Sequence, residues 1–163
     1  MKKRILVSKC LLECCYRYDG KDVKLEDLRE KLKDFEIIAV CPEVEFLNLP
    51  VPRPRLKFVP VENQVRLIKE DDKRDLTEDL RRKSREFIKS IGKIDCAILK
   101  SKSPSCGVGD AKVYRCLECE DELGRRNGIF TEELIKLFPN ITVLSERDFL
   151  REGEEILKEL KER

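Results

Sequence analysis

Short apolar runs alternate with longer amphipathic stretches along the chain. Runs rich in isoleucine, valine and leucine predict strands at residues 5–7, 36–41 and 95–100, with shorter strands at 65–68 and 141–144. Apolar residues at helical spacing predict helices over residues 24–35, 77–91, about 126–137 and 145–160. Four prolines between positions 50 and 60 predict an extended connection rather than a helix.

Strands separated by helices favour a parallel sheet, because parallel neighbours need a long crossover connection. Apolar runs without polar alternation indicate that helices cover both faces of this sheet. We therefore expect residues 1–163 to form a single α/β domain with a mostly parallel sheet, in a Rossmann-like three-layer arrangement.

Three of the expected strands end beside a cysteine in a turn, at Cys10, Cys41 and Cys106. The carboxyl ends of parallel strands meet at one edge of a sheet, which is where α/β proteins bind ligands. A single free cysteine at such a place is more simply a buried core residue. Three at equivalent positions favour a shared metal or cluster site.

Polar groups follow the same strand ends. Glu43 lies two residues after Cys41, and in extended backbone the two side chains point the same way. A carboxylate that is partly desolvated beside such a site suits general-base chemistry on water. The loop at residues 100–107 reads KSKSPSCG, and its hydroxyls and backbone amides can bind a small polar ligand. The candidate substrate-binding serines are Ser8, Ser101 and Ser105. The loop lacks the glycine–lysine spacing of a phosphate loop, which excludes a nucleotide triphosphatase.

Charge and composition narrow the function further. The 35 basic and 33 acidic residues nearly cancel, so the surface is rich in ion pairs rather than polybasic and carries no overall nucleic-acid footprint. Local basic pairs, Lys100 with Lys102 and Arg125 with Arg126, leave such a partner open. A charged fraction of 42% is typical of proteins from hot environments. The chain has no histidine, which excludes hydrolases that need an imidazole base and every histidine metal site.

Cellular location affects how the eight cysteines are interpreted. The chain has neither an apolar run long enough for a membrane span nor a signal-peptide core, so we expect a cytoplasmic protein. Thiols stay reduced there, which favours metal ligands or catalytic groups over disulfides. Cys14 and Cys15 could add ligands to an iron–sulfur centre at Cys10, but their spacing matches no standard ferredoxin run, so we expect packed or exposed thiols. The isolated pair Cys116 and Cys119 fits a local disulfide, a redox pair or an intermolecular metal contact.

Six segments, in order along nearly the whole chain, resemble a widespread family of small bacterial and archaeal proteins that includes the thiouracil desulfidases. They are SKCLL at 8–12, RYDG at 17–20, CPEVE at 41–45, PVPR at 50–53, DLT at 75–77 and KSKSPSCG at 100–107. The resemblance implies a 4Fe-4S cluster held by Cys10, Cys41 and Cys106, with one iron open to substrate. It places the family's catalytic glutamate on Glu43 and its catalytic serine on Ser103.

The activity that this resemblance implies is non-redox desulfuration of a thiolated nucleobase such as thiouracil. The open iron would bind the thiocarbonyl sulfur, Glu43 would deprotonate the attacking water, and sulfide would be released. Two alternatives remain open: a sulfur carrier in nucleoside or tRNA thiolation, and a non-enzymatic metal–thiolate binding module. The chain departs from the family at residues 46–48, where Phe46, Leu47 and Asn48 replace the usual glycine pair, and we expect these residues to line the entrance to the site.

Overall fold

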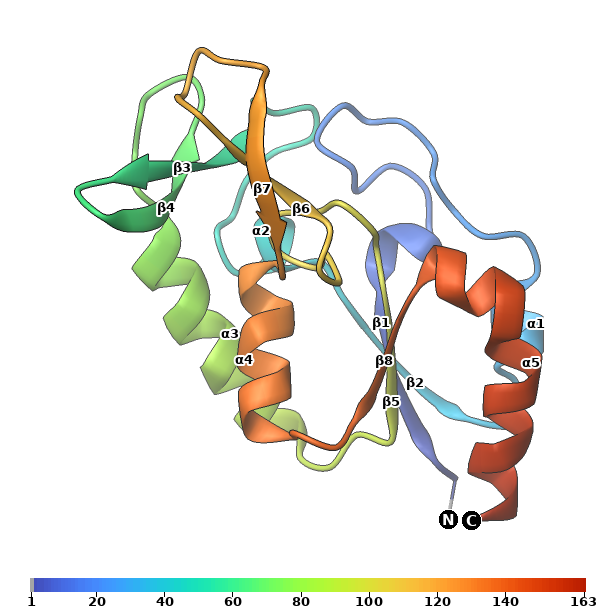
Figure 1. The fold of residues 1–163 in the computed structure, drawn as a ribbon. Coiled ribbons are helices and arrows are strands. Elements are labelled where there is room, and N and C mark those ends of the chain that lie inside the picture. The colour runs from blue at the N-terminus through green and yellow to red at the C-terminus, as the bar shows by residue number, and fades with distance from the viewer. Residues whose placement is uncertain (1) are drawn as a thin grey trace.

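The computed structural model describes residues 2–163 and contains two four-stranded sheets. The first sheet is entirely parallel, in the order β2-β1-β5-β8. Its strands cross the middle of the molecule in Figure 1. Their bounds are β1 Arg4–Ser8, β2 Glu36–Val40, β5 Cys96–Leu99 and β8 Thr142–Ser145.

Helices cover both faces of the parallel sheet, which confirms the expected three-layer α/β arrangement. Along β1, the side chains of Ile5 and Val7 pack on one face with helices α1 (Leu28–Lys31) and α5 (Glu146–Glu162). The side chain of Leu6 packs on the other face with α3 (Thr77–Ile91) and α4 (Ile129–Leu137). Strand side chains alternate between the two faces of a sheet, so the apolar run of β1 contributes to both cores.

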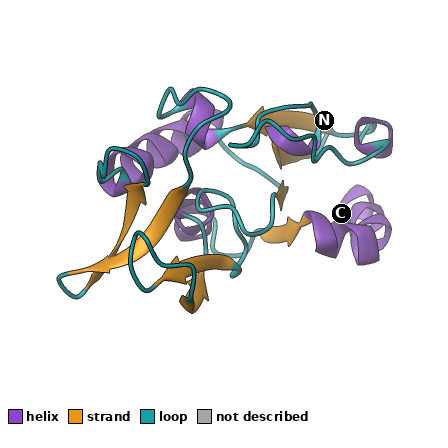
Figure 2. Ribbon diagram, turned by 90° about the horizontal axis from the view of Figure 1, so that it is seen from above, coloured by secondary structure: helices purple, strands orange, loops and turns teal. Residues whose placement is uncertain are grey.

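The second sheet was not predicted from the sequence pattern. It has the order β4-β3-β6-β7, and β3 and β6 are its one parallel pair. It packs on α3 and α4 through a third core that includes Phe58, Leu80 and Ile129. Figures 1 and 2 show it on the side of the molecule away from α5. The bounds are β3 Leu56–Val61, β4 Gln64–Lys69, β6 Ala111–Tyr114 and β7 Glu122–Arg126.

Two helix predictions were too long. Over residues 24–35 the structure contains the short helix α1 alone, because Asp27 before it adopts a left-handed conformation with φ of 58°. The helix predicted from about residue 126 begins at Ile129, since Arg126 is the last residue of β7 and Gly128 occupies the N-cap. By contrast, α3 ends before Gly92 and α5 begins after Ser145, as the sequence predicted. A capping box between Ser145 and Asp148 starts α5.

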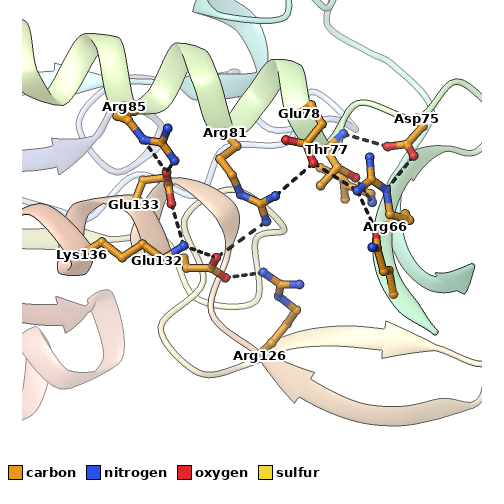
Figure 3. A network of polar contacts seen from close by, with 12 residues as sticks. Arg66, Asp75, Thr77, Glu78, Arg81, Arg85, Arg126, Glu132, Glu133 and Lys136 are labelled. Atoms are coloured by element: carbon orange, nitrogen blue, oxygen red, sulfur yellow. Dashed lines mark hydrogen bonds and ion pairs between the residues drawn. The ribbon is translucent and has the colours of Figure 1, made fainter. Parts of the chain in front are cut away.

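Ion pairs connect the second sheet to the helices (Figure 3). Arg66 of β4 binds Asp75 and Glu78, and Arg81 of α3 binds both Glu78 and Glu132 of α4. Such a network fits the near-equal numbers of acidic and basic residues. None of the helices in residues 2–163 combines the length and apolarity that spanning a membrane requires.

Candidate active site

The three cysteines at strand ends surround one cavity of about 180 Å³. They follow β1, β2 and β5, which are adjacent in the sheet. The register aligns Ser8 with Val40 and Val7 with Ile98, so the three strands end at nearly the same level. Parallel topology and register therefore bring Cys10, Cys41 and Cys106 together, although they are far apart in the sequence.

Local structure holds the first two cysteines in place. Cys10 lies in the 3-10 turn η1 (Lys9–Leu11) that follows β1. Cys41 occupies the N-cap position of α2 (Pro42–Glu45), where its N–H donates to the carboxylate of Glu45 at 2.7 Å. Proline at the first helical position is favourable, because it has no N–H that would need a partner. The two elements thus fix both cysteines at the carboxyl edge of the sheet.

All three thiols are free, and their environment opposes the thiolate form. Burial raises the pKa of Cys106 to about 12. Burial also raises the pKa of Cys10, and the nearby Cys106 and Cys41 raise it further. Burial is likewise the main cause of the raised pKa of Cys41. Three thiols that share one cavity become stable thiolates when a cation compensates their charge, as in a metal or cluster site.

Glu43 lies in the same cavity and is held by two side chains. Its Oε1 accepts hydrogen bonds from Nε and Nη2 of Arg53, at 3.2 and 3.1 Å. Its Oε2 accepts a hydrogen bond from the hydroxyl of Ser105 at 3.3 Å. Because both side chains of this ion pair are buried, the carboxylate has a fixed orientation rather than a mobile surface position.

Ser103 organises the loop that carries the third cysteine. Its Oγ accepts hydrogen bonds from the backbone N–H groups of Ser105 and Cys106, at 3.1 and 3.0 Å, and lies 3.0 Å from the Oγ of Ser105. The first turn of α4 holds the same loop from outside, where the N–H of Phe130 donates to the Ser105 carbonyl at 2.9 Å. Ser103, Ser105 and Glu43 therefore form a continuous line of polar groups.

The two other candidate serines also line the cavity, but each already has a partner. Ser101 donates its hydroxyl and its backbone N–H to the carboxylate of Glu146. Ser8 accepts a hydrogen bond from the N–H of Lys100 at 2.9 Å. Both serines connect strand ends within the structure, and substrate binding by either stays a prediction.

Other expectations about individual residues need correction. Cys14 and Cys15 are joined in a disulfide rather than present as thiols. Cys116 and Cys119 form a local disulfide, one of the three alternatives that the sequence left open. Phe46, Leu47 and Asn48 do not line the cavity. The ring of Phe46 packs against Phe87 and Phe130 instead, because α2 turns this side chain towards α3 and α4.

Sequence reasoning missed three features of the site. The PVPR motif gives Arg53 no role, and the pattern at residues 145–160 indicates only a helix, with no role for Glu146. Tyr16, Arg17 and Tyr18 form one wall of the cavity, and the last two also line a neighbouring cavity of about 260 Å³. Among residues 2–163, no three His, Cys, Asp or Glu side chains converge closely enough to ligate a single metal ion.

Comparison with known proteins gives the fold and the site a context. No curated protein sequence is significantly similar to the chain. A solved structure, the 4Fe-4S-dependent thiouracil desulfidase TudS, is 29% identical to it and superposes with a TM-score of 0.67 over 96% of this chain and 99% of that one. Residues 5–146, which include every cavity residue described above, match the model of the 2-thiouracil desulfurase family. The chain therefore belongs to the 2-thiouracil desulfurase family.

Proposed function

We propose that this protein removes sulfur from a thiolated nucleobase of the thiouracil type and releases it as sulfide. The observation that carries the proposal is the convergence of three free cysteines with Glu43 and Ser103 on one cavity. Family membership and the likeness to a thiouracil desulfidase support the same activity.

The donor set of the cavity fits a 4Fe-4S cluster. Its three cysteines are soft ligands of the kind that hold iron–sulfur clusters, and all three are free and line the same cavity. Each cysteine of such a cluster binds a different iron, so the three sulfurs need not meet around a single ion. We assign Cys10, Cys41 and Cys106 as its ligands. When bound, the cluster would supply an iron without a protein ligand, a Lewis acid for the thiocarbonyl sulfur.

The protein groups around this position supply the rest of the chemistry. Glu43 accepts the proton of the attacking water on Oε2, the oxygen that Arg53 leaves free. Ser103 hydrogen-bonds the substrate with its hydroxyl while its oxygen stays anchored by two backbone N–H groups. Residues 16–18 and 100–106 line the cavity in which these groups would meet the substrate. No step requires a net transfer of electrons.

Anaerobic reconstitution with iron and sulfide, followed by a single-turnover assay with 4-thiouracil, tests the proposal. We expect about four irons and four sulfides per chain, and formation of uracil together with one sulfide per active site. A loaded protein that releases no sulfide from 4-thiouracil but transfers sulfur to a nucleoside acceptor would instead be a sulfur carrier. Binding of zinc without iron, and without turnover, would indicate a non-enzymatic metal–thiolate module.

A further inference from the structure

Arg53 lies in the cavity wall, and all three nitrogens of its guanidinium group donate hydrogen bonds. It lies within the proline-rich segment between residues 50 and 60 and is 7% exposed. Besides its two bonds to Glu43, its Nη1 donates to the carbonyl of Pro50 at 3.1 Å and its Nη2 to the carbonyl of Tyr16 at 3.1 Å. Its backbone N–H donates to the carbonyl of Tyr18 at 2.7 Å. One residue thus connects the carboxylate to both ends of the aromatic wall at residues 16–18.

The pairing with Glu43 is also selective between the two carboxylate oxygens. Nε and Nη2 both donate hydrogen bonds to Oε1. Oε2 therefore accepts no hydrogen bond from Arg53 and can accept one from Ser105 and one from a group in the cavity. The planar guanidinium presents its donors in a rigid fork, which explains how one side chain can hold a carboxylate and two carbonyls at once. A lysine has a single nitrogen at the end of a flexible chain and cannot satisfy all of these acceptors together.

We infer that Arg53 is a positioning residue for the activity proposed above, holding the carboxylate of Glu43 and the wall at residues 16–18 in a fixed mutual arrangement. It acts through these groups and contacts no reacting atom itself. The inference rests on the proposed function for its catalytic consequence, whereas the arrangement can be measured without turnover.

The first test uses Arg53→Lys, which keeps a positive charge beside Glu43. We expect kcat for 4-thiouracil to fall by about 100-fold at matched iron content, because loss of alignment at a reacting centre has effects of this size. We also expect KM to rise, because the substrate-facing wall loses an anchor. Parental kcat and KM in this variant would overturn the inference.

The second test separates positioning from general structural support. Arg53→Ala leaves a gap that opens into the cavity, and guanidinium ion at low millimolar concentration should restore part of the lost turnover in a saturable manner. The matched control is Arg85→Ala. Arg85 binds the buried Glu133 with the same two nitrogens on one oxygen, at 3.0 and 2.5 Å, but between α3 and α4 (Figure 3). Guanidinium should not raise the turnover of that control variant.

Hydrogen exchange provides a measurement that does not depend on activity. In Arg53→Ala, amide exchange should accelerate in peptides covering residues 16–20 and 42–46 and slow again when guanidinium is added, whereas peptides from α5 should not change. If the parent protein releases no sulfide, the proposed function fails, and this measurement still decides whether Arg53 positions the wall. Unchanged exchange in both peptides, with or without loss of activity, would refute the inference.

Discussion

The main chain of Gly128, at the N-cap of α4, packs directly against the main chain of Ser105. A Cβ at position 128 would meet the carbonyl group of Ser105 and would lie 2.7 Å from the backbone nitrogen of Cys106, closer than real Cβ atoms approach other atoms. The φ of Gly128 is −63°, so close approach, not an unusual backbone conformation, requires glycine here.

We therefore expect Gly128→Ala to displace the loop that carries Cys106. The variant should incorporate less than half of the parental iron on reconstitution and should unfold at a lower temperature, because backbone on both sides must move. Gly124→Ala is the matched control, since a Cβ at Gly124 in β7 would meet no atom within 4 Å. Iron analysis and thermal unfolding of both variants make the comparison. Equal iron content in Gly128→Ala and the parent would contradict the expected displacement.

Some of this arrangement could be predicted from the sequence and some could not. Strands β1, β2 and β5 are continuous apolar runs, and each precedes a cysteine, so parallel topology alone predicts the convergence of Cys10, Cys41 and Cys106. The role of Gly128 depends on contact with a loop more than twenty positions away. Such a contact leaves no periodic pattern in the sequence.

The second sheet was missed for a different physical reason. Strand β7 reads ELGRR, has no apolar alternation and is mostly exposed, because it lies at the edge of its sheet. In residues 24–35, the leucines Leu25, Leu28 and Leu32 do face a core, as their spacing indicated. These three leucines pack in that core even though no long helix forms, since the left-handed backbone of Asp27 interrupts the helix between Leu25 and Leu28. Arg53 and Glu146 were missed because their pairings, Arg53 with Glu43 of α2 and Glu146 with Ser101, follow no periodic pattern in the sequence.

Replacing any one of the three cavity cysteines should abolish cluster incorporation. Cys10→Ala, Cys41→Ala and Cys106→Ala each remove one of three protein ligands, and the remaining two cannot retain the cluster through reconstitution. Iron and sulfide analysis with the visible absorbance spectrum is the measurement. The disulfide cysteines at residues 116 and 119 lie outside the cavity, so their alanine variants should keep full iron content. Full iron content in Cys41→Ala would show that the ligand assignment is wrong.

Glu43→Gln should separate cluster binding from chemistry. The amide oxygen of glutamine can still accept hydrogen bonds from Arg53, so the visible spectrum of the reconstituted protein should match that of the parent. Loss of the base should lower single-turnover sulfide release by about 100-fold. Glu78→Gln, on the exposed side of α3, serves as the control with parental activity. Sulfide release at the parental rate from Glu43→Gln would place the base elsewhere.

Ser103→Ala tests the structural contribution of the loop serine. Its oxygen accepts two backbone N–H groups, so we expect the free energy of unfolding to fall by about 1 kcal/mol, as for loss of a typical intramolecular hydrogen bond. Ser90→Ala is the control, because that exposed hydroxyl donates to a carbonyl within α3 and its loss should change stability by at most about 0.5 kcal/mol. Urea unfolding of the apo proteins makes the comparison. A loss in Ser103→Ala no larger than in the control would show that the loop is held by α4 alone.

Glu146 should make the stability of the apo protein depend on pH in the acid range. Burial by itself raises the pKa of this carboxyl, but hydrogen bonds from the side chain and backbone of Ser101 and the charge of Lys100 outweigh it, so the pKa in the folded state lies below the ordinary 4.5. A group with a lowered folded-state pKa contributes its full stabilisation above its unfolded-state pKa and loses it as the pH falls through the folded-state value. Glu146→Gln removes the charge at every pH. We therefore expect the variant to be about 2 kcal/mol less stable than the parent at pH 7, the size typical of hydrogen bonds to a charged group.

This difference in unfolding free energy should shrink as the pH falls below 4.5, because the unfolded parent is protonated first and the folded parent then loses the charge at its lower pKa. Urea unfolding of both proteins between pH 7 and pH 3 measures it. Glu152→Gln, an exposed position on the same helix, is the control and should track the parent at every pH. A difference between Glu146→Gln and the parent that stays constant across this range would mean that the lost contacts, and not the charge, account for the stabilisation.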